Sequence, residues 1–102
     1  MIPQQGDVWW AEAEDKRRPV LVVTRSEAVG VLSSIIVAPV TRTIRRIPTE
    51  LLLSPDDGLP ADSVATFDAL QPIRRTFLTT RITRIDDARS RICRALSAFA
   101  DC

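Results

Sequence analysis

The sequence predicts one small, mainly β domain that is completed by a C-terminal helix. Three observations lead to this fold class. The 102 residues are the size of one ordinary domain, which we place at 1–102. Short stretches of strand character alternate with proline and glycine along most of the chain. After residue 86 the apolar residues change to helical spacing. Five or six strands and one amphipathic helix favour a barrel-like sheet with the helix packed on it.

The first two predicted strands lie close together at the N-terminal end. Val8–Ala13 has strand character and places Trp9 and Trp10 on opposite faces, because side chains alternate along a strand. Pro19–Arg25 contains a continuous apolar run of mostly β-branched residues. Such a run is typical of a central strand that is buried on both faces.

The middle of the chain adds further strands and one clear turn. Ser34–Val40 is again apolar, but Pro39 places the end of this strand at an edge or a bulge, because proline donates no ladder hydrogen bond. Thr49–Leu53 and Ser63–Leu70 have weaker strand character. The segment Ser54–Gly58 has the composition of a turn.

The last segment predicts an amphipathic helix. Asp86 is a suitable N-cap, and Asp87 adds a favourable negative charge in the first turn. Cationic side chains are expected on the outer side, at Arg89, Arg91 and Arg94. A shorter helical turn is possible within Arg75–Arg81. The apolar face of the long helix consists of Ala88, Ile92, Ala95, Leu96 and Phe99.

Composition excludes several classes of protein. The hydrophobic fraction of 45% is ordinary for a packed core and argues against disorder. Apolar runs are only as long as a strand, which is much shorter than a bilayer span. Gly6 and Asp7 fall where a signal peptide would have its apolar segment. We therefore expect a cytoplasmic protein.

Metal and cofactor chemistry are not expected. The chain has no histidine, and its two cysteines, Cys93 and Cys102, do not have the spacing of metal ligands. We interpret both as reduced thiols, with Cys93 partly buried. Because the usual general base near pH 7 is absent, catalysis would have to use Arg, Asp, Glu, Ser or Thr.

The type of cationic residue is more informative than the net charge. The net charge is only +1, but arginine supplies all of the fourteen cationic side chains except Lys16. The planar guanidinium suits phosphates and stacked bases. A GC-rich genome would give the same composition, so the positions of the arginines have to decide.

Two basic segments and two acids stand out by position. The cluster at Lys16–Arg18 precedes the most apolar strand, and Thr41–Arg46 follows another. Each could be a solvated turn or a polar hairpin loop. Together, two Arg-rich loops at the ends of central strands would form one electropositive rim for phosphates. Asp62 precedes the predicted strand 63–70 and Asp68 lies near its end, and either could be a turn residue or an acid with a chemical role.

RNA suits a site of this composition. Its own 2′-hydroxyl can attack the adjacent phosphorus, so a protein needs only to align the attack and stabilise the charge on the phosphorane oxygens. Arginine is always charged and can donate two hydrogen bonds to such oxygens, and a threonine hydroxyl can donate another. The reaction requires no metal ion.

Four motifs in a fixed order give the chain a family resemblance. They are Gly6–Trp10 followed by Arg18–Val23, then Val37–Thr41, then Asp62–Val64 with Asp68, and finally Leu78–Ile82 before the last helix. Each motif alone is common, but together they span almost the whole chain. The sequence resembles the MazF/PemK family of toxin ribonucleases.

The resemblance implies a fold, an activity and partners. The implied fold is a compact SH3-like barrel with a C-terminal helix. The implied activity is metal-independent cleavage of single-stranded RNA at short sequences, by a homodimer that a MazE-like antitoxin inhibits. The family's catalytic arginine and threonine fall on Arg18 and Thr41, and an acid that acts in acid–base catalysis in the PemK branch falls on Asp68. The residues expected to contact RNA are Trp9, Arg17, Arg42, Arg45, Arg46 and Gln71.

The chain also departs from the family pattern. The segment Glu14–Arg17 is shorter than the loop that usually lies between the first two strands. Ala69 follows the acid where the family usually has glutamine, and the nearest glutamine is Gln71. Two alternatives remain. One is a toxin of the same fold that binds a protein such as gyrase, as CcdB does, and the other is an unrelated small β-domain that serves only as an interaction module.

Overall fold

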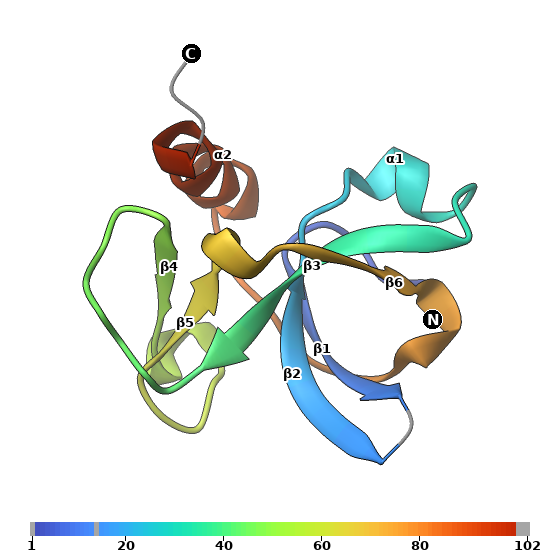
Figure 1. Ribbon diagram of the computed structural model, residues 1–102, viewed down its shortest axis with the longest axis horizontal. Helices are drawn as coiled ribbons and strands as arrows, with labels where there is room; N and C mark the ends of the chain where they lie inside the picture. The colour runs from blue at the N-terminus through green and yellow to red at the C-terminus, as the bar shows by residue number, and fades with distance from the viewer. Residues whose placement is uncertain (1, 14, 100–102) are drawn as a thin grey trace.

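The structure is a computed structural model, and it describes residues 2–13 and 15–99 (Figure 1). Seven strands form one strongly curled sheet in the order β4-β5-β3-β2-β1-β7, and β6 pairs with β3 outside this path. In chain order, the strands and α-helices are β1 (Asp7–Ala13), β2 (Lys16–Val22), α1 (Ser26–Val29), β3 (Ser34–Thr41), β4 (Glu50–Leu53), β5 (Ser63–Thr66), β6 (Gln71–Arg74), β7 (Leu78–Arg84) and α2 (Ala88–Phe99). No helix in the described ranges is long and apolar enough to cross a membrane.

Strand β3 connects the two parts of the sheet. On one side it pairs with β2, where Pro39 lies opposite Val20. On its other side β6 pairs with residues 34–37, and β5 pairs with residues 40 and 41. Pro39 therefore lies in the gap between two partner strands. This position satisfies the expectation that proline stands where the ladder is interrupted.

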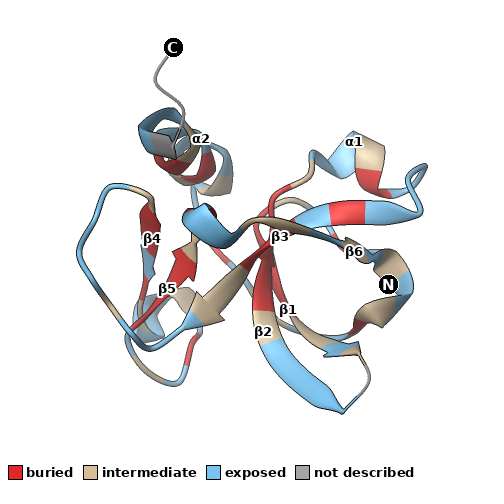
Figure 2. Ribbon diagram, in the orientation of Figure 1, coloured by how far each residue is buried: buried red, intermediate tan, exposed pale blue. Residues whose placement is uncertain are grey.

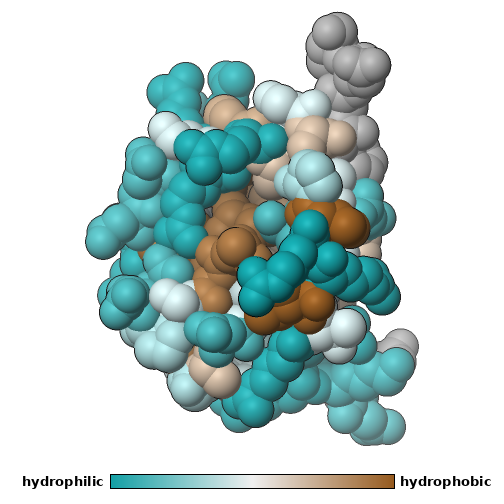
Figure 3. All heavy atoms as spheres, turned by 90° about the vertical axis from the view of Figure 1, so that its left-hand side faces the viewer, coloured by the Kyte–Doolittle hydropathy of each residue, from teal (hydrophilic) through white to brown (hydrophobic). Residues whose placement is uncertain are grey.

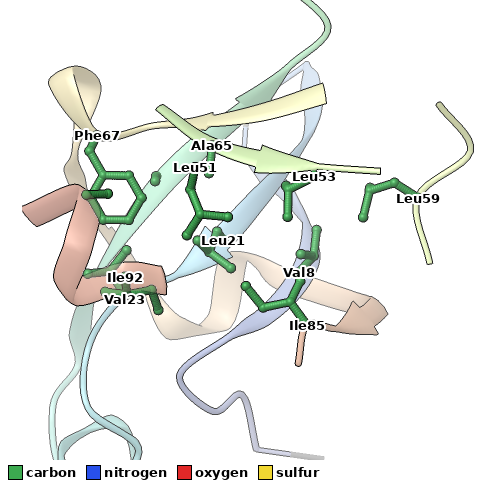
Figure 4. Close-up of a cluster of buried hydrophobic side chains, with 12 residues drawn as sticks. Val8, Leu21, Val23, Leu51, Leu53, Leu59, Ala65, Phe67, Ile85 and Ile92 are labelled. Carbon is green, nitrogen blue, oxygen red and sulfur yellow. The ribbon is translucent and has the colours of Figure 1, made fainter. Parts of the chain in front are cut away.

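Both sides of the sheet are packed, and β2 contributes to both. Val20 belongs to a cluster with Trp9 and Val29. Leu21 belongs to a second cluster that lies under α2 and includes Ile92 (Figure 4). The predicted burial of residues 20–23 on both faces is confirmed, but the strand runs from Lys16 to Val22 and so ends three residues before the predicted end of Pro19–Arg25.

Two strands were not predicted, and one prediction was too long. β6 and β7 occupy residues 71–84, where the sequence suggested only a helical turn, and that turn is restricted to a short 3₁₀ segment, Arg75–Phe77. The predicted strand Ser63–Leu70 ends at Thr66 and continues as a second 3₁₀ turn, Phe67–Ala69. β6 has only four residues and β7 (LTTRITR) is mostly polar, so neither shows a clear apolar alternation in the sequence.

The C-terminal helix is confirmed, but its beginning differs from the prediction. It begins at Ala88, and Asp87 rather than Asp86 directly precedes it, with φ 53° and with its carbonyl accepting the N–H of Arg91. Ile92 is buried, but Cys93 is exposed, so the prediction that this thiol is partly buried is wrong. The side chain of Phe99 and Cys102 lie outside the described residues.

The predicted turn at residues 54–58 is confirmed. The Ser54 hydroxyl accepts the N–H of Asp56, and the Asp57 carboxylate accepts the N–H of Ser54, as in a capping box. Gly58 has φ 98°, and a Cβ there would lie 2.4 Å from the Thr83 hydroxyl oxygen. Glycine is required here by both the backbone angle and the close approach of β7.

Candidate functional site

Arg18 lies on a strand and not in a loop. Strand β2 begins at Lys16, so the connection to β1 is reduced to residues 14 and 15, and Glu14 lies outside the described residues. Figure 2 shows the first half of β2 as an exposed arm that continues into the buried half of the strand. The prediction of a basic loop at this place is wrong. A strand holds its side chains in a fixed register, so Arg18 is more constrained than a loop residue.

Arg18 and Thr41 lie on the same side of neighbouring strands. Val20 and Pro39 are opposite each other in the β2–β3 ladder, and each candidate residue lies two positions beyond one of them. Because side chains repeat every second residue, the two face the same way. Both are exposed, and Arg18 makes no ion pair or hydrogen bond with the described residues. The Thr41 hydroxyl oxygen accepts the N–H of Thr43 at 3.2 Å, which leaves its own hydrogen free to donate.

A hollow of about 400 Å³ beside Arg18 collects cationic side chains. We call it the basic hollow; its polar lining includes Lys16, Arg18, Gln71 and Arg74, and none of the described residues that line it carries a carboxylate. Arg74 arrives there because β6 pairs with β3, with Ser34 opposite Arg74. A concave surface with cations and no acid favours an anion such as a phosphate. The sequence missed Arg74 because it did not predict β6.

Trp9, which we expected to contact RNA, is buried, whereas Trp10 is partly exposed. Trp9 is buried, and its indole N–H donates to Asp7 at 3.2 Å. We therefore withdraw Trp9 from the predicted RNA contacts. Trp10 is half-buried, and the Arg17 guanidinium lies 4.2 Å from its ring centroid. Arg17 also lies 3.8 Å from a carboxylate oxygen of Glu12.

The buried carboxylate of Glu50 fixes the backbone of the second basic segment, Thr41–Arg46. Glu50 accepts the backbone N–H groups of Arg45 and Arg46 at 3.0 and 2.9 Å. The side chains of both arginines and of Arg42 are exposed. Arg42 lines a different hollow from Arg18, and Arg46 lines a third with Asp62. The two basic segments therefore line separate hollows, and one electropositive rim across them stays a prediction.

Asp68 is separated from the other two candidate catalytic residues. It lies on the exposed 3₁₀ turn after β5, and its carboxylate accepts the hydroxyl of Thr49 at 2.5 Å. It lines neither the basic hollow nor the hollow that includes Thr41. Gln71, in contrast, lines the basic hollow with Arg18.

The face formed by β4 and the loop before it has an apolar centre. Figure 3 views this face and shows hydrophobic side chains within a surround of hydrophilic ones. Leu52 and Ile47 are 52% and 37% exposed. Exposed apolar groups with a polar border are typical of a surface that contacts another protein.

Comparison with known proteins agrees with this geometry. A family model described as a PemK-like, MazF-like toxin of type II toxin–antitoxin systems matches residues 4–99. The chain belongs to this PemK/MazF toxin family. Membership excludes the unrelated interaction module and confirms the expected fold, a curled β-sheet with a C-terminal helix.

Two named relatives and one solved structure of the PemK/MazF family come from Mycobacterium tuberculosis. The chain is 40% identical over 104 residues to a probable endoribonuclease, MazF5, of Mycobacterium tuberculosis, covering 99% of this chain and 95% of that protein. It is 35% identical to the probable endoribonuclease MazF2 of the same species, covering 97% and 99%. The solved M. tuberculosis toxin MazF-mt6 superimposes with a TM-score of 0.81 at 32% identity, covering 91% and 95%.

Proposed function

We propose that this chain is the toxin of a type II toxin–antitoxin pair and acts as a sequence-specific, metal-independent endoribonuclease on single-stranded RNA. The observation that carries this proposal is the exposed Arg18 in the basic hollow, with Thr41 exposed at the end of the neighbouring strand and outside that hollow. The names of the mycobacterial relatives support the same activity. We place this activity in the cytoplasm, where messenger, ribosomal and transfer RNA are all present.

The proposed reaction is a transesterification within the RNA. The 2′-oxygen bonds to the adjacent phosphorus, the bond from phosphorus to the 5′-oxygen breaks, and the products end in a 2′,3′-cyclic phosphate and a 5′-hydroxyl. Arg18 stabilises the phosphorane oxygens, and Thr41 donates a hydrogen bond to them. Lys16 and Arg74 bind neighbouring phosphates in the basic hollow. A base accepts the proton of the 2′-hydroxyl, and the leaving oxygen takes up a proton. Asp68, or a water molecule that it holds, is our candidate for this base although it lines neither hollow, and the Asp68→Asn variant tests it.

A homodimer and an antitoxin complete the proposal. Solved structures with the same fold include the MazE–MazF complex of Deinococcus radiodurans, with a TM-score of 0.79 at 21% identity. We expect a symmetric dimer of about 23 kDa, twice the 11.3 kDa chain, in sedimentation at micromolar concentration. An acidic and apolar MazE-like tail would compete with RNA for the arginines, and its binding would weaken with salt.

Incubation with a long single-stranded RNA in EDTA tests the activity. We expect discrete fragments that carry cyclic phosphate ends. A substrate with 2′-deoxyribose at the cut site should bind without being cut, because its attacking hydroxyl is absent. Cleavage of that substrate at the normal rate would rule out the mechanism. Intact RNA together with binding to gyrase would favour the CcdB-like alternative.

A further inference from the structure

Glu50 is a buried acid next to the basic loop that follows β3. It is the first residue of β4 and is 8% exposed. One oxygen of its carboxylate accepts both the N–H of Arg45, at 3.0 Å, and the N–H of Arg46, at 2.9 Å. A carboxylate beside two arginines would ordinarily form an ion pair with a guanidinium group. Here the acid bonds to the backbone of the arginines instead, and their side chains form no ion pair among the described residues.

The carboxylate is also the anchor of the middle of this loop. At the beginning of the loop, the Thr41 hydroxyl oxygen accepts the N–H of Thr43. At its end, the Thr49 carbonyl accepts an N–H of the 3₁₀ turn after β5. Between these two points, Glu50 supplies the hydrogen bonds that residues 44–46 make within the described part of the chain. The conformation of the loop therefore depends on this one side chain.

The bonds to Glu50 compensate for an unusual backbone conformation. Arg46 has φ 58°, in the left-handed region that residues with a long side chain rarely adopt. Such a conformation persists only where surrounding contacts offset its strain. Two consecutive N–H groups that converge on one anion are a contact of this kind. Removal of the carboxylate would therefore release the whole loop and not a single side chain.

We propose that Glu50 is a positioning residue for RNA binding: it keeps the loop in the conformation that presents the guanidinium groups of Arg45 and Arg46 to the phosphates of the RNA. This inference rests on the proposed ribonuclease function and adds an acid that acts on substrate affinity through the loop. A preformed loop loses less conformational freedom on binding than a mobile one, so its contacts contribute more to affinity. Glu50 thus strengthens the binding of a polyanion, although its own charge opposes it.

The sign of a change in RNA affinity tests the proposal. Removal of a negative charge near a phosphate site should by itself tighten RNA binding. We expect Glu50→Ala instead to weaken it severalfold, measured with random-sequence single-stranded RNA in an Arg18→Ala parent that does not cut the RNA. The slope of the logarithm of affinity against the logarithm of salt concentration should decrease by about 0.7 for each phosphate contact that is lost.

Three further variants serve as controls. Glu50→Gln should keep nearly the full affinity, because its amide oxygen can accept both N–H groups. Glu50→Asp keeps the charge but withdraws the carboxylate by one methylene, so it should weaken binding and replaces Glu50→Ala if that variant does not fold. Glu27→Ala removes an exposed acid on α1, on the opposite side of the molecule from the loop (Figure 1), and should not weaken binding.

Two measurements separate positioning from a purely structural role. In cleavage assays with Arg18 intact, Glu50→Ala should raise KM more than it lowers kcat, because contacts to neighbouring phosphates stabilise the bound substrate and the transition state alike. In a protein that already carries Arg45→Ala and Arg46→Ala, Glu50→Ala should weaken RNA binding no further, since the acid acts through those two side chains.

The outcomes distinguish this inference from the proposed function. A folded Glu50→Ala variant that binds RNA as tightly as its parent, or more tightly, would overturn the inference alone. So would a loss of affinity of the same size when both arginine side chains are absent, or an equal loss in Glu50→Gln. A parent protein without affinity for single-stranded RNA would overturn the proposed function and this inference with it.

Discussion

Arg91 of α2 and Asp57 of the turn before β5 form a short, largely shielded ion pair. The Arg91 Nη1 atom lies 2.8 Å from Asp57 Oδ1, and the two side chains are only 23% and 15% exposed. Arg91 also donates to the carbonyl of Leu52 at 2.6 Å. One side chain of the helix therefore fixes both the turn and the edge strand β4, so this arginine does not lie on the purely polar side that we expected.

This pair predicts a loss of stability in acid. The hydrogen bond from Arg91 holds the pKa of Asp57 below its ordinary value of 3.8, and the backbone N–H of Ser54 acts in the same direction. A lowered folded-state pKa stabilises the protein fully above the ordinary value, and this stabilisation disappears as the pH falls through the lowered value. The free energy of unfolding, measured with urea between pH 6 and pH 2, should therefore fall less steeply in Asp57→Asn than in the unchanged protein. Equal slopes would show that Asp57 does not contribute.

Asp7 is expected to be the most costly acid to remove. It is 1% exposed and accepts hydrogen bonds from the Trp9 indole, the Gln4 N–H and Arg84. Asp7→Ala would leave the buried indole N–H unpaired, and we expect a loss of about 1–3 kcal/mol in urea unfolding. Arg84 is half exposed, so solvent screens its part of the effect. A matched Asp56→Ala change in the exposed turn should cost much less.

Arg18→Ala should abolish most cleavage and leave the fold intact. Arg18 is exposed and unpaired within the described ranges, so its removal does not disturb packing. Loss of one donor to the transition state typically lowers the rate by about 10²- to 10³-fold. Arg18→Lys should restore only part of the rate, since an ammonium cannot donate two parallel hydrogen bonds. An equally large loss of RNA affinity would instead assign Arg18 to binding alone.

Thr41 and Thr43 form a natural pair for comparison. They are two residues apart, and the Thr41 hydroxyl oxygen already accepts the N–H of Thr43. Thr41→Ala should slow cleavage by about 10- to 100-fold, the range for one hydrogen bond to a charged group. Thr43→Ala keeps the backbone N–H and should change the rate little. Equal effects of the two changes on single-turnover cleavage would contradict the role of Thr41.

Asp68→Asn separates a proton acceptor from a structural acid. The amide oxygen of asparagine can still accept the hydroxyl of Thr49, so the turn should keep its shape. We expect slower cleavage and a flatter dependence of the rate on pH, because the proton acceptor is lost. A pH profile parallel to that of the unchanged protein would leave Asp68 with the Thr49 contact alone.

The sequence predicted the elements whose residues carry a strong periodic signal. The run at residues 20–23 and the face of α2 with Ile92 and Ala95 are buried as expected. β6 could not be predicted because it has only four residues and they include Pro72. Its existence depends on pairing with β3, a long-range contact that no local pattern records.

Prediction of the site was limited in the same way. The motifs singled out Arg18 and Thr41, and the ladder between β2 and β3 places them on one side. Arg74 lines the basic hollow because β6 pairs with β3, and since β6 was not predicted, nothing in the sequence placed Arg74 in the site. Trp9 and Trp10 were correctly placed on opposite faces of β1. Which of the two is buried depends on residues from distant segments that pack on each face, and these contacts leave no local signal in the sequence.

The shared strand β3 also sets an order for local opening. Its amides pair with β2 on one side and with β6 and β5 on the other. β4 lies at the edge of the sheet and could detach from β5 while β3 stays paired. Release of β3, in contrast, would break its pairing with β2, β5 and β6 at once and unfold the whole sheet. In deuterium exchange we therefore expect β4 to label by subglobal opening and the centre of β3 to label only through global unfolding.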